Sequence, residues 1–249
     1  MRSTFTDRSH LSKTGWSTQD ASRAKALRPN GQFIASSQSN ARSCRPILPP
    51  SSAVQRVTLM PHHASTDVLQ PHRSAILIID LQQKLVPVIP SGQDVVAWTQ
   101  SLLQGADLLD VPSAATVQYP KGLGGLVDPL DQQFPSAQEK LDFSSAVCRT
   151  ALDRWHHEGR DQILVCGIET HICVLQTVLD LLAEGKQVFI VSEAVAARGG
   201  WEHETAMAQM QQQGAIITTV ESVFFQWLRS ASHPQFKAIS KLVKSFADG

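Results

Sequence analysis

The stretch AILIID, residues 75–80, is an unbroken apolar run that ends in a carboxylic acid. Such a run is typical of a strand that is buried on both faces of a parallel sheet. Four more mainly apolar segments follow along the chain: SAATVQY (113–119), QILVCG (162–167), VFIVSE (188–193) and AIITTV (215–220). We interpret all five runs as strands.

Helical patterns of apolar residues separate these runs. They cover residues 93–109, 145–158, 173–184 and 201–213, and two short amphipathic segments fill residues 221–246. Strands that alternate with helices in this way predict βαβ units with right-handed crossovers. We therefore expect one α/β domain with three layers, α/β/α, around a mainly parallel sheet.

The charge balance of the chain excludes several classes of partner. The 249 residues include 22 Lys and Arg against 22 Asp and Glu, so the formal net charge is zero. A neutral chain has no overall attraction for nucleic acid or for an anionic membrane surface. No apolar run reaches the roughly 20 residues of a membrane helix, and the N-terminus lacks the apolar core of a secretory signal. Since four cysteines also fit a reducing compartment, we predict a soluble, cytoplasmic protein.

Residues 1–70 differ in composition from the rest of the chain. They are rich in Ser, Arg, Gln and Pro, and residues 1–66 hold nine basic residues against two acidic ones. Segments of this kind bury too little apolar surface to fold. We therefore interpret residues 1–70 as a disordered or mis-assigned N-terminal extension and residues 71–249 as the folded domain. An organellar transit peptide, or a start of translation at Met60, are the two explanations left open for the extension.

Two familiar nucleotide-binding motifs are missing from the sequence. No GxGxxG follows the first strand, and GxxxxGK[ST] occurs nowhere in the chain. These motifs let phosphate groups approach backbone amides, so dinucleotide and P-loop chemistry are disfavoured. The Gly- and Pro-rich segment 120–135 is interpreted as a long loop, and a loop of this length inside a domain is more often functional than idle.

Three polar residues near the predicted strand ends are candidates for a site, because ligands of open parallel sheets bind at the carboxyl ends of strands. Asp80 ends the first strand, where it either caps the next turn or accepts a proton. Cys173 lies in the first turn of a helix, and the positive end of the helix dipole is expected to lower the pKa of its thiol. Lys140 follows the long loop, and beside Asp80 it would keep the carboxylate ionised.

The other cysteines of the domain are expected to be structural. Cys166 falls inside the third strand and Cys148 inside a helix, where a cysteine acts as a small buried apolar residue. A zinc site made of Cys166, His171 and Cys173 is disfavoured, because the spacing is not that of a zinc motif and the ligands number fewer than four.

Three segments in this order resemble the isochorismatase-like cysteine hydrolase superfamily, and within it the isochorismatase domain-containing branch: IIDLQ (78–82), EKLDFSSA (139–146) and GIETHICVLQT (167–177). The resemblance covers residues 72–230 and includes VSEAVAARGGWEH at 191–203. It implies the Rossmann-like fold of that superfamily and a catalytic triad of Asp80, Lys140 and Cys173. It also implies a cis peptide bond between Ile168 and Glu169, and an oxyanion hole made of the backbone amides of Glu169 and Cys173.

The resemblance also implies a reaction. A cysteine at position 173 favours hydrolysis of amide or other C–N bonds of a small molecule, through a thioester, over the vinyl ether cleavage of a true isochorismatase. Nicotinamidases usually hold a metal through Asp and His after the second strand, but segment 116–134 has no histidine. We expect no catalytic metal and no cofactor. Glu193 stands where the family often has Asp, which leaves the role of that turn in doubt.

Other functions and one geometric question remain open at this point. The fold could serve as a non-catalytic oligomeric scaffold, or Cys173 could sense oxidants. Because family members commonly assemble, we expect a homo-oligomer, with VFFQW (223–227) and Trp201 at the interface or with Phe224 and Trp227 packed on the sheet instead. The question concerns Thr170, whose hydroxyl would occupy the Cys173 amide if it capped the helix.

Overall fold

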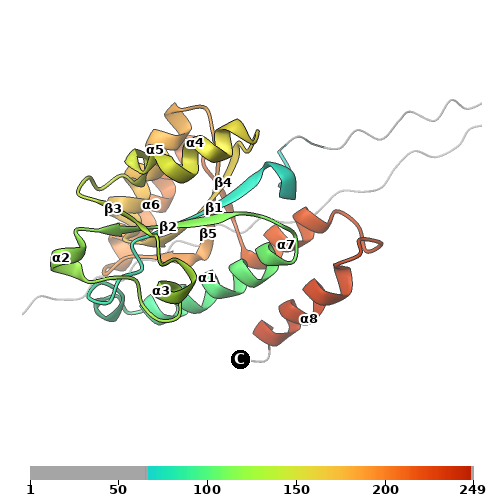
Figure 1. Ribbon diagram of the computed structural model, residues 1–249, viewed down its shortest axis with the longest axis horizontal. Coiled ribbons are helices and arrows are strands. Elements are labelled where there is room, and N and C mark those ends of the chain that lie inside the picture. Colours follow the sequence, from blue (N-terminus) through green and yellow to red (C-terminus); the bar gives the residue numbers. More distant parts are fainter. Residues whose placement is uncertain (1–64, 66, 248–249) are drawn as a thin grey trace, which may run out of the picture. The chain divides into compact units, whose positions relative to one another are not determined.

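The sheet of this computed structural model contains six parallel strands in the order β3-β2-β1-β4-β5-β6 (Figure 1). Residue 65 and residues 67–247 are described, so the expected extension lies outside them except for its last residues. The strands are β1 (Ser74–Ile79), β2 (Ser113–Gln118), β3 (Gln138–Lys140), β4 (Gln162–Ile168), β5 (Gln187–Ala196) and β6 (Ile216–Thr218). The α/β fold with a parallel sheet is confirmed.

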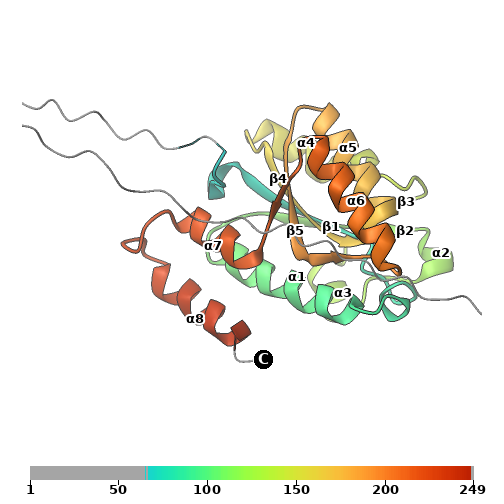
Figure 2. The ribbon, with the colours of Figure 1, turned by 180° about the vertical axis from the view of Figure 1, so that it is seen from behind.

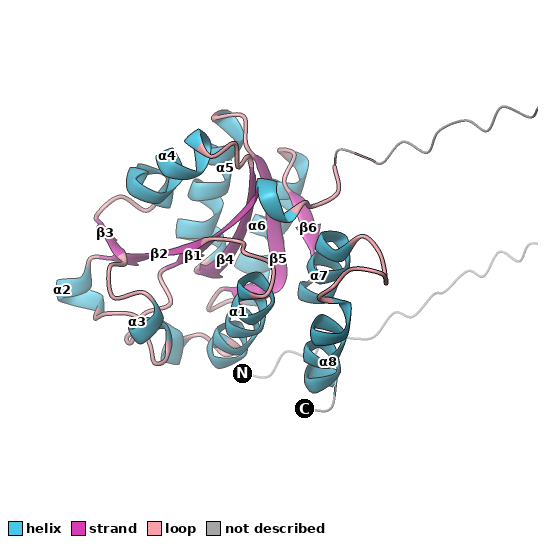
Figure 3. Ribbon diagram, turned by 45° about the vertical axis from the view of Figure 1, so that its right-hand side comes forward, coloured by secondary structure: helices cyan, strands magenta, loops and turns pink. Residues whose placement is uncertain are grey.

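Helices cover both faces of the sheet (Figures 2 and 3). One face carries α1 (Gly92–Asp107), α7 (Val220–Leu228) and α8 (Phe236–Ala247), and the other carries α4 (Arg149–His157), α5 (Leu175–Ala183) and α6 (Gly200–Gln212). Strand β1 shows why its sequence is apolar throughout. Ile76 and Ile78 join the core beneath the first group of helices, whereas Leu77 and Ile79 join the core beneath the second. Successive side chains of a strand point to opposite faces, so both sets must be apolar.

Several short elements differ from the expected ones. The segment expected to be a long loop contains two short helices, α2 (Pro120–Leu123) and α3 (Leu130–Gln133), and β3 follows it as an unexpected edge strand. The helix expected over 145–158 begins as a 3-10 turn, Ser145–Val147, and the one expected from 173 begins as a π turn, Thr170–Val174. Further 3-10 turns cover Pro71–Arg73 and Val86–Val88. A period of apolar residues cannot distinguish these tight or wide turns from an α-helix.

The first described residues already belong to the domain. Leu69 is fully buried, and its amide donates to Gln226 Oε1 at 3.1 Å. The next amide, of Gln70, donates to Gln162 Oε1 at 2.8 Å. The chain therefore packs against α7 and β4 before β1 begins.

A close contact between two helices gives a test of the packing. Gly105 on α1 faces Phe224 on α7, and a Cβ at residue 105 would overlap the phenyl ring. We expect Gly105→Ala to lower the free energy of unfolding by about 1–3 kcal/mol, the usual cost of overpacking a core. This should occur although alanine is the better helix former by about 1 kcal/mol. Urea denaturation measures the change.

The matched control is Gly125→Ala, because nothing lies within 4 Å of a Cβ placed there. It should leave the urea midpoint close to that of the unchanged protein. If Gly105→Ala were as stable as this control, the contact between α1 and α7 would be looser than described.

Candidate active site

Three strand ends at one edge of the sheet carry the candidate site residues. Asp80 follows β1, Lys140 ends β3, and Cys173 lies in the π turn after β4. In the strand order these ends are close together, with β2 between β3 and β1 and with β4 next to β1. The structure thus brings the three predicted side chains to the carboxyl ends of the strands, where parallel sheets bind ligands.

Asp80 and Lys140 form a buried ion pair. Lys140 Nζ lies 2.6 Å from Asp80 Oδ2, and neither side chain is exposed. The second carboxylate oxygen, Oδ1, accepts a hydrogen bond of 2.9 Å from Thr116 Oγ1. Asp80 has a φ of 55°, in the left-handed region that costs energy for residues other than glycine. Backbone strain of this kind often accompanies function.

The ammonium group of Lys140 has a full set of acceptors. Besides Asp80, it donates to Gln118 Oε1 at 2.8 Å and to the carbonyl oxygen of Phe143 at 3.0 Å. The carbonyl oxygen of Asp142 lies at 3.4 Å. An ammonium group has three protons to donate, so these partners hold Lys140 in place and leave it little freedom to turn toward another group.

Strand β2 supplies polar partners that sequence reasoning missed. Gln118 fixes Lys140 through its Oε1 atom and donates from Nε2 to the carbonyl oxygen of Leu141 at 2.8 Å. Gln82 accepts from the Gln118 amide at 2.8 Å and donates to the carbonyl oxygen of Gly124 at 2.6 Å. Thr116 and Gln118 are polar residues at the end of the otherwise apolar run SAATVQY, and this was the available signal.

The environment of Cys173 corrects one prediction from the sequence. The thiol was expected to have a lowered pKa, but the structure raises the pKa of Cys173 to about 12. Burial is the first cause, because only 6% of the residue is exposed, and the negative charge of Asp80 is the second. The positive charge of Lys140 lowers the pKa and only partly offsets these effects. At neutral pH the thiol is therefore protonated beside a carboxylate, and it must lose its proton for the sulfur to attack.

The structure of the turn that carries Cys173 shows whether the Thr170 hydroxyl occupies the Cys173 amide. The Thr170 hydroxyl shares a hydrogen bond of 3.0 Å with His203 Nδ1 and caps no backbone amide. Within the part of the chain that the structure describes, nothing outside the Thr170–Val174 turn accepts from the Cys173 amide. The peptide bond between Ile168 and Glu169 is cis, at the position that the resemblance implies.

Close packing and hydrogen bonds fix this turn on its strand. Gly167 has a φ of 126°, and a Cβ there would collide with the backbone of Ile79 on β1. At the start of α5, Thr177 Oγ1 donates to the carbonyl oxygen of Cys173 at 2.6 Å and accepts from the Ser145 amide at 2.7 Å. The segment that follows Lys140 is in this way tied to the segment that carries the thiol.

The other described cysteines are buried and free. Cys166 lies inside β4 and burial raises the pKa of its thiol to about 12. Cys148 precedes α4 instead of lying within a helix as expected, and burial raises its pKa as well. Cys44 falls outside the described residues. No group of three or more His, Cys, Asp or Glu able to hold a metal occurs among the residues described, and His171 belongs to none.

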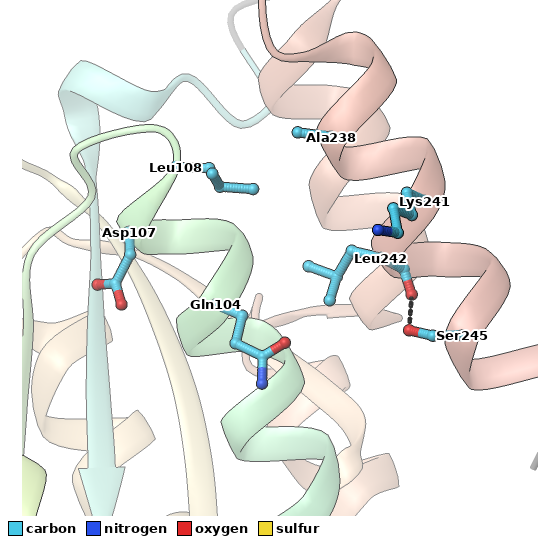
Figure 4. A pocket seen from close by; sticks show the side chains of 7 residues that line it. All are labelled: Gln104, Asp107, Leu108, Ala238, Lys241, Leu242 and Ser245. Carbon is cyan, nitrogen blue, oxygen red and sulfur yellow. Dashed lines mark hydrogen bonds between the residues drawn. The ribbon is translucent and has the colours of Figure 1, made fainter.

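Two pockets differ in their relation to this edge. One, of about 430 Å³, lies between the segment after β2 and strand β3, and is lined by Tyr119, Pro120, Lys121, Glu139, Lys140 and Leu141. The other, of about 490 Å³, lies between α8 and the C-terminal end of α1 (Figure 4). Helix α1 ends shortly before β2 begins. This second pocket therefore lies near the amino ends of the strands, away from the carboxyl ends that carry the candidate site residues.

The expected interface segment VFFQW is mostly core. Val223, Phe224 and Trp227 are buried in the packing of α7, whereas Phe225 is 41% exposed. Trp201, at the start of α6, is 79% exposed. None of the described helices has both the length and the apolar character needed to cross a bilayer.

Comparisons with known proteins show the family and the fold. The family model "Isochorismatase domain" matches residues 74–222. Isochorismatase domain-containing protein 2A of Mus musculus is 41% identical over 73% of this chain and 87% of its own length. Among solved structures, MAR1 ribonuclease from Caenorhabditis elegans is 34% identical with a TM-score of 0.65, covering 71% of this chain and 92% of that one. The YcaC gene product of Escherichia coli, described as an octameric hydrolase of unknown specificity, is 21% identical with a TM-score of 0.61, covering 75% and 99%.

Proposed function

Because the chain belongs to the isochorismatase family, we propose that it is a cysteine-dependent hydrolase acting on amide or other C–N bonds of a small molecule. The observation that carries this proposal is the buried Lys140–Asp80 pair, whose charges both act on the thiol of Cys173. A nucleophile, a proton acceptor and a fixed cation are the groups that acyl transfer through a thioester needs. The proposal includes no metal and no cofactor.

In the proposed reaction, Asp80 takes the proton of the Cys173 thiol as sulfur attacks the carbonyl carbon of the substrate. The negative oxygen of the tetrahedral intermediate is held by the amides of Glu169 and Cys173. Protonated Asp80 then gives its proton to the departing amine, which leaves a thioester on Cys173. A water molecule, activated by the same carboxylate, releases the acid and restores the thiol.

The raised pKa of the thiol supports the role proposed for Asp80. If the thiolate existed before attack, the carboxylate would have no proton to remove. A thiol with a pKa of about 12 is instead almost fully protonated at neutral pH. We therefore assign to Asp80 the role of a general base that acts in the same step as the attack. Lys140, whose protons are taken by its acceptors, serves to orient Asp80 and to stabilise negative charge at the site.

We also propose that the protein is a homo-oligomer. The segment after Lys140 carries two exposed apolar side chains, Leu141 at 75% and Phe143 at 52% exposed. Together with Trp201 they offer apolar area to a second copy of the chain. The non-catalytic scaffold and the ribonuclease named for the relative from Caenorhabditis elegans are the competing functions.

Trapping the thioester tests the proposal. The purified protein would be incubated with a panel of small primary amides in the presence of hydroxylamine, which attacks thioesters to give hydroxamates. We expect hydroxamate to form with at least one amide. In a parallel reaction without hydroxylamine, quenched with acid, we expect peptide mass to find the acyl group on Cys173 but not on Cys148 or Cys166. Turnover of an amide or of RNA that gave neither hydroxamate nor an acyl group on Cys173 would rule out the proposed mechanism.

A further inference from the structure

A chain of two buried hydroxyl groups leads to the carboxylate of Asp80. Thr116 Oγ1 lies 2.9 Å from Asp80 Oδ1, and Ser145 Oγ lies 3.0 Å from Thr116 Oγ1. Thr116 is 1% exposed, and both Ser145 and Asp80 are fully buried. Among the residues that the structure describes, Ser145 Oγ has no hydrogen-bond partner other than Thr116. Water therefore does not compete for these hydroxyl groups.

The negative charge of Asp80 sets the direction of both hydrogen bonds. An ionised carboxylate only accepts, so Thr116 donates its single hydroxyl proton to Asp80. Thr116 then has no proton left for Ser145, and in the second bond Ser145 is the donor. Each hydroxyl in this order donates to the next group. Without the serine hydroxyl, the threonine oxygen would lose the donor that holds it in place.

The same serine is anchored to the turn that carries Cys173. Its amide donates to Thr177 Oγ1 at 2.7 Å, and that hydroxyl donates to the carbonyl oxygen of Cys173 at 2.6 Å. Thr177 is fully buried as well. The hydroxyl of Ser145 thus leads to the proposed base, and its amide leads to the turn of the proposed nucleophile.

The two oxygens of Asp80 are held by different donors. Lys140 Nζ lies 2.6 Å from Oδ2, and Thr116 Oγ1 lies 2.9 Å from Oδ1. The terminal torsion of an aspartate has broad minima, so a single donor would leave the carboxylate free to rotate. Two donors on different oxygens fix its plane. They also fix the lone pairs that remain to accept a proton from the thiol.

We propose that Thr116 and Ser145 are positioning residues: the serine holds the threonine hydroxyl on the carboxylate of Asp80, and the threonine fixes the plane in which that carboxylate accepts a proton. The inference rests on the proposed function, in which Asp80 is the general base. It gives a role in the reaction to two hydroxyl groups that act only through Asp80.

Acetylation by p-nitrophenyl acetate is a probe for this step. The sulfur of Cys173 bonds to the carbonyl carbon, the thiol proton passes to Asp80, and p-nitrophenolate leaves with the electron pair of the broken C–O bond. The carboxylic acid then releases its proton to water. Initial release of p-nitrophenolate against ester concentration, less the release by Cys173→Ala, gives a maximum acetylation rate and a half-saturating concentration. Peptide mass after an acid quench locates the acetyl group.

Thr116→Val should lower the maximum acetylation rate about 10-fold, the effect of losing one hydrogen bond to a charged group. The half-saturating concentration should not change, because the hydroxyl acts on Asp80 and not on the ester. Thr116→Ser keeps the hydroxyl and should restore most of the rate.

Thr218→Val is the matched control. Thr218 is another buried strand threonine, at the end of β6, and its hydroxyl has no hydrogen-bond partner within the described part of the chain. This variant should be acetylated at the rate of the unchanged protein.

Ser145→Ala tests the outer hydroxyl alone, because the amide bond to Thr177 remains. It should lower the maximum acetylation rate about fivefold, as expected for one neutral hydrogen bond. In a Thr116→Val background the serine has no hydroxyl to hold. Adding Ser145→Ala there should cause no further loss, since two residues on one path are not additive.

The outcomes distinguish the two proposals. If the unchanged protein is never acetylated at Cys173, the proposed function fails and the role of the hydroxyl chain fails with it. If acetylation occurs but Thr116→Val keeps the full rate, or Thr116→Ser restores none of it, the positioning role is wrong. A loss from Ser145→Ala that is as large in the Thr116→Val background would show that the serine does not act through the threonine. An equal loss in Thr218→Val would assign the effect to packing.

Discussion

Cys173→Ala is expected to lower amide hydrolysis by about 10⁶-fold, as removal of the nucleophile does in other enzymes that work through an acyl intermediate. Without the sulfur no thioester can form, and Asp80 has no proton to accept. The fold should survive, because the thiol contributes little packing and the ion pair between Asp80 and Lys140 remains in place. Substrate consumption and hydroxamate formation, measured with the amide found by the trapping experiment, give the size of the loss.

The control for this substitution is Cys166→Ala. Cys166 is also buried, lies in the strand that leads to the same turn, and is not assigned to the site. It should lose stability through a small cavity but keep its activity. If Cys173→Ala kept its activity, Cys173 would not be the nucleophile and the cysteine hydrolase mechanism would be wrong. Equal losses of activity in both variants would point to damage of the fold.

The strands show how much of the fold could be predicted. AILIID and QILVCG are buried on both faces, and their unbroken apolar character indicates a parallel sheet directly. Strand β3 could not be found, because Gln138–Lys140 is a polar edge strand of three residues with no apolar period. Its position matters, since pairing with β2 is what brings Lys140 beside Gln118 and Asp80.

The site was predictable in its residue types but not in its electrostatics. Position in the chain places Cys173 at a helix start, where the helix dipole favours a thiolate. Burial and the charge of Asp80 depend on strands distant in the sequence, and together they raise the pKa of the thiol. The partner of Thr170 was equally hidden, because His203 is 33 residues further on. Local signals describe a turn, whereas only the packed sheet shows which groups surround it.

The charge of Asp80 leads to a result that a simple loss of structure would not give. Asp80→Asn removes the proposed general base, and we expect amide hydrolysis to fall by about 10²–10⁴-fold. The same substitution removes the negative charge that raises the pKa of Cys173 and leaves the positive charge of Lys140 in place. The thiol should therefore become more acidic as the enzyme becomes less active.

Alkylation of Cys173 by iodoacetamide, followed from pH 7 to pH 10, measures this shift. Below its pKa the thiolate fraction rises about tenfold per pH unit, so the unchanged protein should react slowly at pH 7 and steadily faster toward pH 10. Asp80→Asn should react faster than the unchanged protein at every pH below the pKa of about 12. Asp142→Asn, on the exposed segment after Lys140, is the control and should alter neither alkylation nor turnover. If Asp80→Asn slowed alkylation together with turnover, Asp80 would be promoting formation of the thiolate before attack, and the single step of proton removal and attack proposed for Cys173 would be wrong.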